Sequence, residues 1–219
     1  MPAGRLVVGS FNPGKVAEVR AALEAAGIGV PVVALKEVQG APIHVEKGTT
    51  FEQNAEGKAL HYSRFGRELT LTDDSGLCVD ALGGAPGVYS ARYGPPDKVK
   101  VEDAERWGWL LEQMKDVPDG QRGAAFVCVL VLGRWGRLVK TFRGECRGEI
   151  LRAPRGSGGF GYDPVFYHPA SGRTFAEMTE PEKRAVSHRG AAMALLIEYL
   201  KGPESPLTGK TITQPGAKG

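Results

Sequence analysis

Two adjacent carboxylates are the first residues of this sequence whose types could do chemistry. Asp73 and Asp74 follow the run 69–72, in which leucine and threonine alternate, and precede Ser75 and Gly76. We expect a strand over 69–72 that ends at the aspartates, where α/β proteins commonly place their sites. Side chains alternate along an extended chain, so one carboxylate should meet a ligand while the other organises the loop. Considered alone, these residues are explained equally well by a turn with two solvated aspartates.

A carboxylate pair of this kind suits Mg²⁺, which takes one or two protein oxygens together with substrate phosphates and keeps several waters. A further carboxylate is needed to hold the metal. Glu46, in the loop before the helix expected over 50–65, is available. Considered alone, a loop glutamate is more simply explained as solvated.

The second candidate is a short polar run between an expected strand and an expected helix. It reads Ser10-Phe11-Asn12-Pro13-Gly14-Lys15. Unpaired backbone N–H groups and the helix dipole favour an anion there, and the lysine completes a phosphate cradle. The run does not match the P-loop pattern, because one glycine is missing and Val16 stands where a Mg²⁺-binding Ser or Thr would be. A plain helix cap with a solvated lysine explains the run somewhat better on its own.

The third candidate is a glycine-rich loop with aromatic side chains, expected over 155–162. It continues into Asp163, and its last part reads Gly158-Gly159-Phe160-Gly161-Tyr162-Asp163-Pro164. Glycines let the backbone approach a ligand closely, a planar base can stack on Phe160, and backbone amides or Asp163 can read the edge of that base. A turn whose aromatic residues belong to the core is the weaker alternative, because such a turn rarely needs so many glycines.

The fourth candidate is a cationic cluster beside an expected helix start at Glu180-Pro181. It consists of Lys183 and Ser187-His188-Arg189-Gly190. Lysine and arginine can neutralise phosphate, and arginine can also bond a carbonyl group or stack on a ring. Alone, the cluster is best explained as a solvated charged face. Together, however, the four candidates supply the components of a nucleoside triphosphate site.

The elements that must position these residues alternate between strands and helices. Strands are expected over 5–10, 30–35, 69–72, 124–132 and 137–147, and helices from Lys15 to 26, over 50–65, around 107–114, from Glu180 and over 191–200. The last two strands flank the turn 133–136 and should form a hairpin. The alternation predicts an α/β fold, and the hairpin brings antiparallel pairing into the sheet, which should be mixed.

Composition bounds the kind of protein. At 219 residues we expect one domain of two lobes over 1–201, followed by a disordered tail over 202–219. The net charge of +3, from 28 basic and 25 acidic residues, is too near balance for a general nucleic-acid binder. Three widely spaced cysteines suggest neither a disulfide framework nor a zinc site and favour the reducing cytoplasm. No apolar stretch is long enough for a membrane span, so no membrane partner is expected. The near-balanced charge likewise gives no expectation of a nucleic-acid partner.

The sequence resembles the inosine/xanthosine triphosphate pyrophosphatases, which remove non-standard purine nucleotides from the nucleotide pool. The motifs that match lie in order along the chain to about Lys201. They are Ser10-x-Asn12-x-x-Lys15, Phe51-x-x-Asn54-Ala55-x-x-Lys58-Ala59, Asp73-Asp74-Ser75-Gly76-Leu77, Gly83-Gly84-Ala85-Pro86-Gly87-Val88-Tyr89-Ser90-Ala91-Arg92, Gly159-Phe160-Gly161-Tyr162-Asp163-Pro164, and Glu182-Lys183 with Ser187-His188-Arg189-Gly190. The resemblance implies hydrolysis of ITP, dITP and XTP to the monophosphate and pyrophosphate with Mg²⁺. It also implies a homodimer whose subunits carry an elongated mixed sheet, with the active site in the cleft between two lobes.

The resemblance also implies roles for individual residues. The run 10–15 would hold the triphosphate, Glu46 and Asp74 would bind the metal, and Asp74 would also accept a proton. Ser75 would touch the substrate, and Lys58 would help Lys15 to neutralise the phosphates. Recognition of the base and its neighbourhood would fall to Phe160, Gly161, Tyr162, Asp163, Lys183, His188 and Arg189. Whether Asp73 or Asp74 activates the water, and how GTP is rejected, stay open.

Two other functions agree with much of this pattern. One is a nucleotide pyrophosphatase of similar architecture that acts on modified pyrimidine triphosphates. The Ser-His-Arg-Gly and Phe-Gly-Tyr-Asp motifs argue against it. The other is a regulatory module that binds a nucleotide without catalysis.

Overall fold

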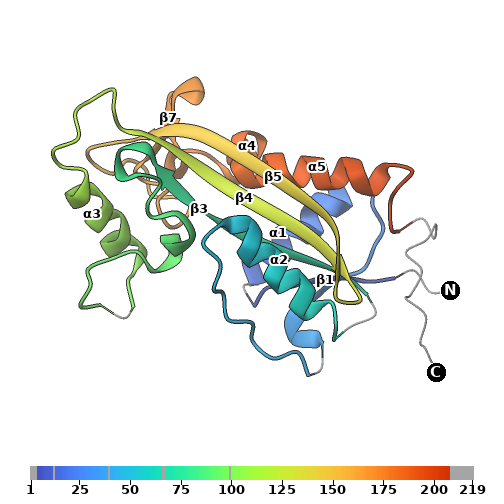
Figure 1. Ribbon diagram of the computed structural model, residues 1–219. Helices are drawn as coiled ribbons and strands as arrows, with labels where there is room; N and C mark the ends of the chain where they lie inside the picture. Colours follow the sequence, from blue (N-terminus) through green and yellow to red (C-terminus); the bar gives the residue numbers. More distant parts are fainter. Residues whose placement is uncertain (1–3, 12, 39, 66–67, 99, 208–219) are drawn as a thin grey trace.

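The computed structural model describes residues 4–11, 13–38, 40–65, 68–98 and 100–207. Within these residues a mixed seven-stranded sheet has the strand order β2-β1-β3-β4-β5-β6-β7 (Figure 1). The strands are β1 Leu6–Val8, β2 Val32–Ala34, β3 Leu69–Val79, β4 Gly123–Arg134, β5 Arg137–Ile150, β6 Phe166–His168 and β7 Arg173–Thr174. β1 pairs in parallel with β2 and β3, whereas the pairs from β3 to β7 are antiparallel. The predicted mixed sheet and the hairpin of β4 and β5 are confirmed.

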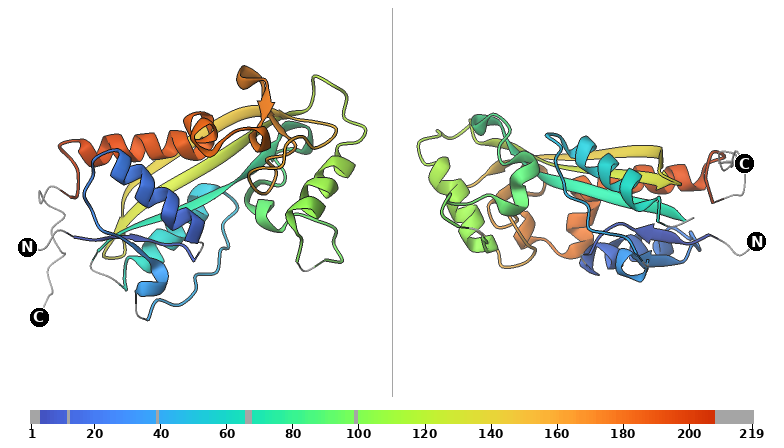
Figure 2. Two further views of the ribbon diagram at one scale, coloured as in Figure 1. Left: turned by 180° about the vertical axis from the view of Figure 1, so that it is seen from behind. Right: turned by 60° about the horizontal axis from the view of Figure 1, so that its bottom comes forward.

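Helices cover both faces of this sheet (Figure 2). They are α1 Pro13–Ala25, α2 Phe51–Tyr62, α3 Asp103–Gln113, α4 Glu180–Val186 and α5 His188–Lys201. α1 and α5 bury their apolar side chains on one face, against residues such as Leu71 and Leu130. α2 packs on the other face against Val129 and Val131. The alternation of β4 between Leu130 and its valine neighbours therefore produces two separate apolar layers.

A second core lies at the end of the molecule that carries α3 (Figure 1). Leu110 and Met114, at the end of the insertion between β3 and β4, pack there with Phe126 and with Phe166 from β6. The long strands β3, β4 and β5 run from this core to the one beneath α1 and α5. Residues that are distant in sequence thus pack together in each core.

Two of the differences between predicted and observed element boundaries bear on the site. α1 begins at Pro13 rather than at Lys15, because proline at the first helical position has its φ already set and lacks only an N–H that would be unpaired there. β3 does not end at 72: its pairing with β4 continues from Thr70 to Val79. The aspartates therefore lie inside a strand and not at its end.

The close packing around β3 explains why glycine is required after the aspartates. A Cβ atom on Gly76 would lie 2.4 Å from Ser90 Oγ and 2.5 Å from the carbonyl oxygen of Gly87. Ser90 in turn accepts a hydrogen bond from Leu77 N at 2.8 Å. Glycine is thus required at position 76 by contacts that leave no room for a side chain.

The first six residues of the expected tail belong to the described part of the chain. Ser205 is buried, and Leu207 packs against the core that includes α5. Positions 208–219 lie outside the described residues. No helix among the described residues combines the length and the apolar character that crossing a bilayer requires.

Candidate active site

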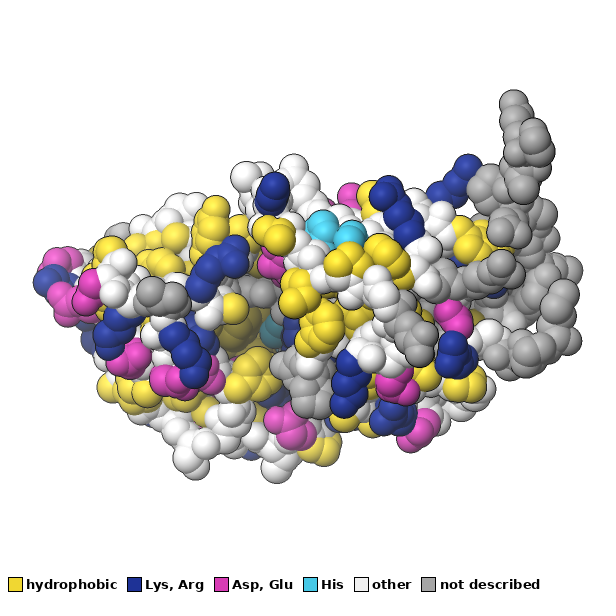
Figure 3. Space-filling view, turned by 90° about the horizontal axis from the view of Figure 1, so that it is seen from below, with side chains coloured by type: hydrophobic (Ala, Val, Ile, Leu, Met, Phe, Trp, Pro, Cys, Tyr) yellow, Lys and Arg dark blue, Asp and Glu magenta, His cyan; other side chains and the backbone are white. Residues whose placement is uncertain are grey.

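A pocket of about 350 Å³ collects residues from separate elements. Seen from below, the molecule is hollowed there, with basic side chains around the opening (Figure 3). The residues that line the pocket include nine of those predicted to form the site: Lys15, Ser75, Phe160, Gly161, Tyr162, Asp163, Lys183, His188 and Arg189. Three of the four candidate segments and the residue after the carboxylate pair therefore share one cavity.

The polar run before α1 contributes chiefly its lysine. Lys15 lines the pocket, Gly14 and Phe11 are exposed, and Ser10 is half-buried. Asn12 lies outside the described residues. The expected phosphate cradle is thus represented by the first turn of α1 and the Lys15 ammonium.

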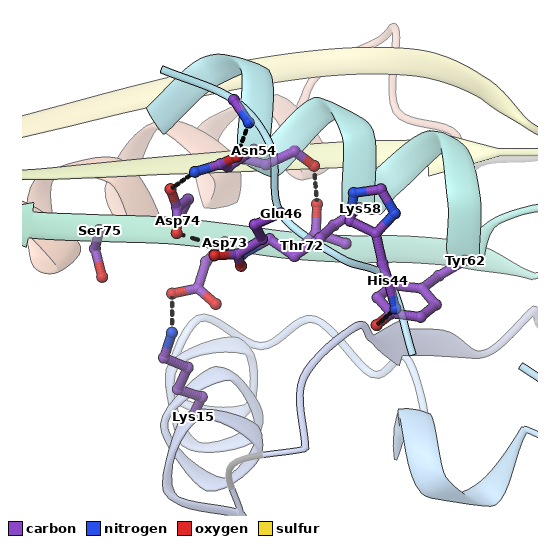
Figure 4. Close-up of polar contacts among 12 residues, drawn as sticks. Lys15, His44, Glu46, Asn54, Lys58, Tyr62, Thr72, Asp73, Asp74 and Ser75 are labelled. Carbon is purple, nitrogen blue, oxygen red and sulfur yellow. Dashed lines mark hydrogen bonds and ion pairs between the residues drawn. The ribbon is translucent and has the colours of Figure 1, made fainter. Parts of the chain in front are cut away.

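The carboxylate pair is divided between the two faces of β3, as the alternation predicted (Figure 4). Asp73 faces α1, where its Oδ2 lies 2.7 Å from Lys15 Nζ and 3.6 Å from Arg189 NH2. Burial acts to raise the pKa of Asp73, but the charges of Lys15 and Arg189 outweigh burial and hold that pKa well below its ordinary range. Asp73 is therefore a permanently charged anchor for two cations from opposite ends of the chain.

Asp74 faces α2 and is held by a different set of groups. Asn54 Nδ2 donates to its Oδ2 at 3.1 Å, and Lys58 Nζ lies 3.4 Å from its Oδ1. The same Lys58 ammonium lies 2.7 Å from Glu46 Oε1. Burial raises the pKa of Asp74 above its ordinary value even though Lys58 acts in the opposite direction. The two aspartates thus differ in proton affinity because of what their faces of the strand contact.

Asn54 belongs to one of the motifs that match the family, but no role was predicted for it. It is buried, and its Oδ1 accepts a hydrogen bond from Gly48 N at 2.8 Å, so its amide nitrogen is left to donate to Asp74. Its sequence signal is a polar residue on the apolar face of α2 between Phe51 and Ala55. Buried polar side chains are normally bonded, so that position already indicated a partner.

The surroundings of Glu46 and Asp74 suit a hard divalent cation. Their carboxylates lie on either side of one ammonium group, that of Lys58. Among the described side chains, no group of three or more His, Cys, Asp and Glu residues gathers to hold a metal. Mg²⁺ needs only one or two protein carboxylates when phosphate and water complete its shell, so the residues present fit that ion.

β1 is much shorter than β3 and pairs only with the first residues of that strand. The pairing of β1 with β3 ends at Val8 and Leu71, just before the aspartates. Beyond that point, the edge of β3 next to α1 has no β1 residue opposite it. Asp73 and Asp74 therefore lie where this edge of β3 has no paired strand in the described part of the chain, and they point to opposite faces.

The aromatic loop and the cationic cluster meet at another part of the pocket. Lys183 Nζ lies 2.5 Å from Asp163 Oδ2 and 4.5 Å from the centre of the Phe160 ring. Asp163 Oδ2 also accepts a hydrogen bond from Phe160 N at 2.8 Å. The Phe160 side chain remains 56% exposed, so its ring is available for stacking.

The two neighbouring residues His188 and Arg189 have different surroundings. His188 stacks on Phe126 with a centroid distance of 4.8 Å, and burial lowers its pKa well below the ordinary value, so the ring is neutral at pH 7. Arg189 NH2 donates to Ser75 Oγ at 3.1 Å. The resemblance implied that Arg189 recognises the base, but its guanidinium lies beside the carboxylate pair.

The pairing of Asp73 predicts a pH-dependent stability. Asp73→Asn should lower the free energy of unfolding at pH 7 by about 2–4 kcal/mol, because it leaves the largely buried Arg189 and the partly exposed Lys15 without their carboxylate. A depressed folded-state pKa stabilises the protein above the unfolded pKa of about 3.9, and this stabilisation is lost as pH falls toward the folded value. The difference between wild type and variant in urea unfolding should therefore shrink below about pH 4. A difference that stays constant or grows in acid would contradict the assignment.

A cavity with cations beside paired carboxylates and an exposed aromatic ring is the kind of site that takes a polyanionic ligand with a planar group. The model of the Ham1 family matches residues 6–199, and the chain belongs to that family. The dITP/XTP pyrophosphatase of Yersinia pestis is 46% identical over 199 residues, which cover 90% of this chain and 98% of that protein. The dITP/XTP pyrophosphatase of Escherichia coli (strain K12) is 44% identical with the same coverage.

A solved structure agrees with this assignment. The HAM1 protein from Coxiella burnetii aligns with a TM-score of 0.82 at 39% identity, covering 90% of this chain and 98% of that one. The family resemblance carried by the sequence motifs is therefore confirmed.

Proposed function

We propose that this protein hydrolyses ITP, dITP and XTP to the nucleoside monophosphate and pyrophosphate. The names of its relatives support this substrate class. The observation that carries the proposal is the pair of charged clusters on the two faces of β3, where one edge of that strand has no paired strand among the described residues. Lys15, Asp73 and Arg189 lie on one face, and Glu46, Lys58 and Asp74 lie on the other. Such an edge can contact several phosphates while the base extends toward Phe160.

We assign water activation to Asp74 rather than Asp73. A general base must bind a proton during the reaction, and its effectiveness rises as its pKa approaches the working pH. The pKa of Asp74 is raised by burial, whereas that of Asp73 is depressed by its cations. Asn54 fixes the orientation of the Asp74 carboxylate. Attack by the activated water at the α-phosphorus would break its bond to the bridging oxygen and release pyrophosphate.

Charge neutralisation at the phosphates would come from both clusters. Glu46 and Asp74 would hold Mg²⁺, which when bound neutralises phosphate oxygens and orients them. Lys15 and Lys58 add positive charge on the two sides of β3. Phosphoryl transfer depends chiefly on positioning and electrostatic stabilisation, so these groups would supply most of the acceleration.

Base selection would depend on donors that face a 6-oxo group. Lys183 and the neutral His188 line the pocket together with Phe160. Hypoxanthine and xanthine present an oxygen there, whereas adenine presents an amino group, which a donor cannot satisfy. An unpaired buried polar group costs about 1–3 kcal/mol, enough to disfavour ATP.

Removing the Lys183 ammonium should weaken this selection. Lys183→Met should raise KM for ITP and narrow the ratio of kcat/KM for ITP over ATP by roughly tenfold, because a charged donor near the base is lost. The variant also leaves Asp163 without its ion pair. The double variant Lys183→Met with Asp163→Asn controls for that unpaired carboxylate. A wild-type ratio in the double variant would place base selection elsewhere.

The proposed reaction is tested with purified protein and a panel of triphosphates. Pyrophosphate and phosphate release should be measured separately for ITP, XTP, dITP, GTP, ATP and modified pyrimidine triphosphates, with and without Mg²⁺. We expect pyrophosphate from the first three and little from ATP. Preference for modified pyrimidines would favour the related pyrophosphatase, and binding without turnover would favour a regulatory module.

The assembly and location expected from the sequence are part of the same proposal. We propose a cytoplasmic homodimer, as the family resemblance implies. Sedimentation velocity at micromolar concentration would distinguish a dimer from a monomer.

A further inference from the structure

A single carboxylate joins α3 to the aromatic loop. Asp103 begins α3, and its Oδ2 accepts a hydrogen bond from the backbone N–H of Gly161 at 2.6 Å. Its Oδ1 accepts a second hydrogen bond from Arg106 NH1 at 2.5 Å. Arg106 NH2 donates to the carbonyl oxygen of Val101 at 2.8 Å. Asp103 and Gly161 are 58 positions apart, so this contact ties the insertion between β3 and β4 to the loop after β5.

The bonded groups are part of the pocket wall. Arg106, Phe160 and Gly161 all line it. Gly161 has a φ of 61°, in the left-handed region, and the preceding Gly159 has a φ of 72°. The loop is thus held in one conformation, whereas an unrestrained glycine-rich chain would adopt many.

Two carboxylates hold consecutive N–H groups of this loop. Asp163, from the loop itself, accepts from Phe160 N at 2.8 Å, and Asp103, from α3, accepts from Gly161 N. The Phe160 ring is 56% exposed, so packing does little to fix it. The position of that ring therefore depends on how its backbone is anchored.

The setting of Arg106 indicates a purpose other than stability. Its side chain is 13% exposed, and its Nε is buried without a hydrogen-bond partner in the described part of the chain. The Asp103 side chain is 49% exposed, so water screens the attraction and the pair adds little to stability. A role in orienting the Asp103 carboxylate accounts for the pair.

We propose that Asp103 is a positioning residue for base recognition. It holds Gly161, and through it the Phe160 ring, at the base-binding part of the pocket, while Arg106 fixes the rotation of the carboxylate. The inference rests on the proposed function, because it places the purine of the substrate against Phe160. A residue of this kind affects binding and selection of the base more than the chemical step.

Three variants test the proposal in the full chain. Asp103→Ala removes both hydrogen bonds, and Asp103→Asn keeps the size of the side chain but weakens the contact with Arg106. Glu112→Gln is the matched control, because Glu112 lies on the same helix in an exposed pair with Lys115. Steady-state kinetics with ITP and ATP should be combined with calorimetric titration of IMP, which reports binding without turnover. Hydrogen exchange of the peptide over 158–163 reports the order of the loop.

We expect Asp103→Ala to raise KM for ITP and Kd for IMP by roughly tenfold, as the loss of a charged hydrogen bond predicts, with kcat changed by less than about twofold. The ratio of kcat/KM for ITP over that for ATP should fall, and hydrogen exchange over 158–163 should become faster. Asp103→Asn should show the same changes to a smaller degree, and Glu112→Gln should show none. If Asp103→Ala is poorly folded, the asparagine variant carries the test.

Other results would overturn the proposal. A lower Tm and kcat in both Asp103 variants, with KM, Kd for IMP and loop exchange unchanged, would make Asp103 purely structural. Wild-type protein that binds IMP but does not hydrolyse ITP would refute the proposed function, while Kd for IMP in the variants would still decide the role of Asp103. Wild-type protein that neither binds IMP nor hydrolyses ITP would overturn both.

Discussion

Asp74→Asn should abolish pyrophosphate release from ITP and XTP and leave the protein folded. The amide can still accept a hydrogen bond from Asn54 or Lys58, so the packing around β3 should persist. It cannot take a proton from water, and it is a poorer ligand for Mg²⁺. General-base catalysis alone contributes about 10²–10⁴-fold, so kcat should fall by at least about a thousandfold once the weakened metal site is added. Initial rates of pyrophosphate release and the Tm measure the two parts of this expectation.

The control for removing a negative charge is Asp119→Asn. Asp119 pairs with Arg152 at the surface and is 83% exposed, and no part of the proposed reaction involves it. This variant should keep wild-type kinetics. Near wild-type turnover by Asp74→Asn would show that the base is another group. Loss of activity together with loss of folding would show that Asp74 acts mainly in packing.

Gly144→Ala should have the largest effect on stability. A Cβ atom there would lie 2.1 Å from the carbonyl oxygen of His188 and 2.5 Å from the backbone nitrogen of Ala192. Both atoms belong to the main chain of α5, so relief requires the helix to move away from β5. We expect about 3 kcal/mol or more of destabilisation, the upper part of the range for overpacking. Because the displaced turn carries His188 and Arg189, KM for ITP should also rise.

A second glycine serves as the matched control for this variant. Gly108 lies inside α3, and a Cβ atom there meets nothing within 4 Å. Gly108→Ala should be neutral or stabilise the protein by up to about 1 kcal/mol, because alanine favours the helix. Urea unfolding of the two variants should therefore shift in different directions. An unchanged midpoint for Gly144→Ala would mean that β5 and α5 can separate without cost.

Most elements of the fold follow from local patterns. The helical spacing of Phe51, Ala55 and Ala59 predicted α2, and the two apolar runs around 133–136 predicted the hairpin of β4 and β5. The predicted end of β3 at residue 72 was wrong, because acidic and glycine residues, which commonly terminate a strand, here lie within it. The pairing of β3 with β4 overrides that local preference, since β4 supplies bonded partners as far as Val79.

The candidate site was also largely predictable, with instructive gaps. Charged, aromatic and glycine residues in ordered motifs led to Lys15, Asp74, Phe160 and Lys183 without knowledge of the fold. Asn54 was overlooked although its place on an apolar helix face indicated a buried partner. Arg106 has no signal in the sequence, because α3 is rich in charged residues and nothing local distinguishes the one that enters the pocket.

The sequence by itself determined the residue types of the site, the family and the order of most elements, because these depend on composition, spacing and motifs along the chain. Only the tertiary structure distinguished Asp73 from Asp74. Their neighbours come from α1 and α5 on one face of β3 and from α2 on the other, and a pKa depends on burial and on the charges that folding brings near. The hydrogen bond of Asp103 to Gly161 is likewise a product of the fold.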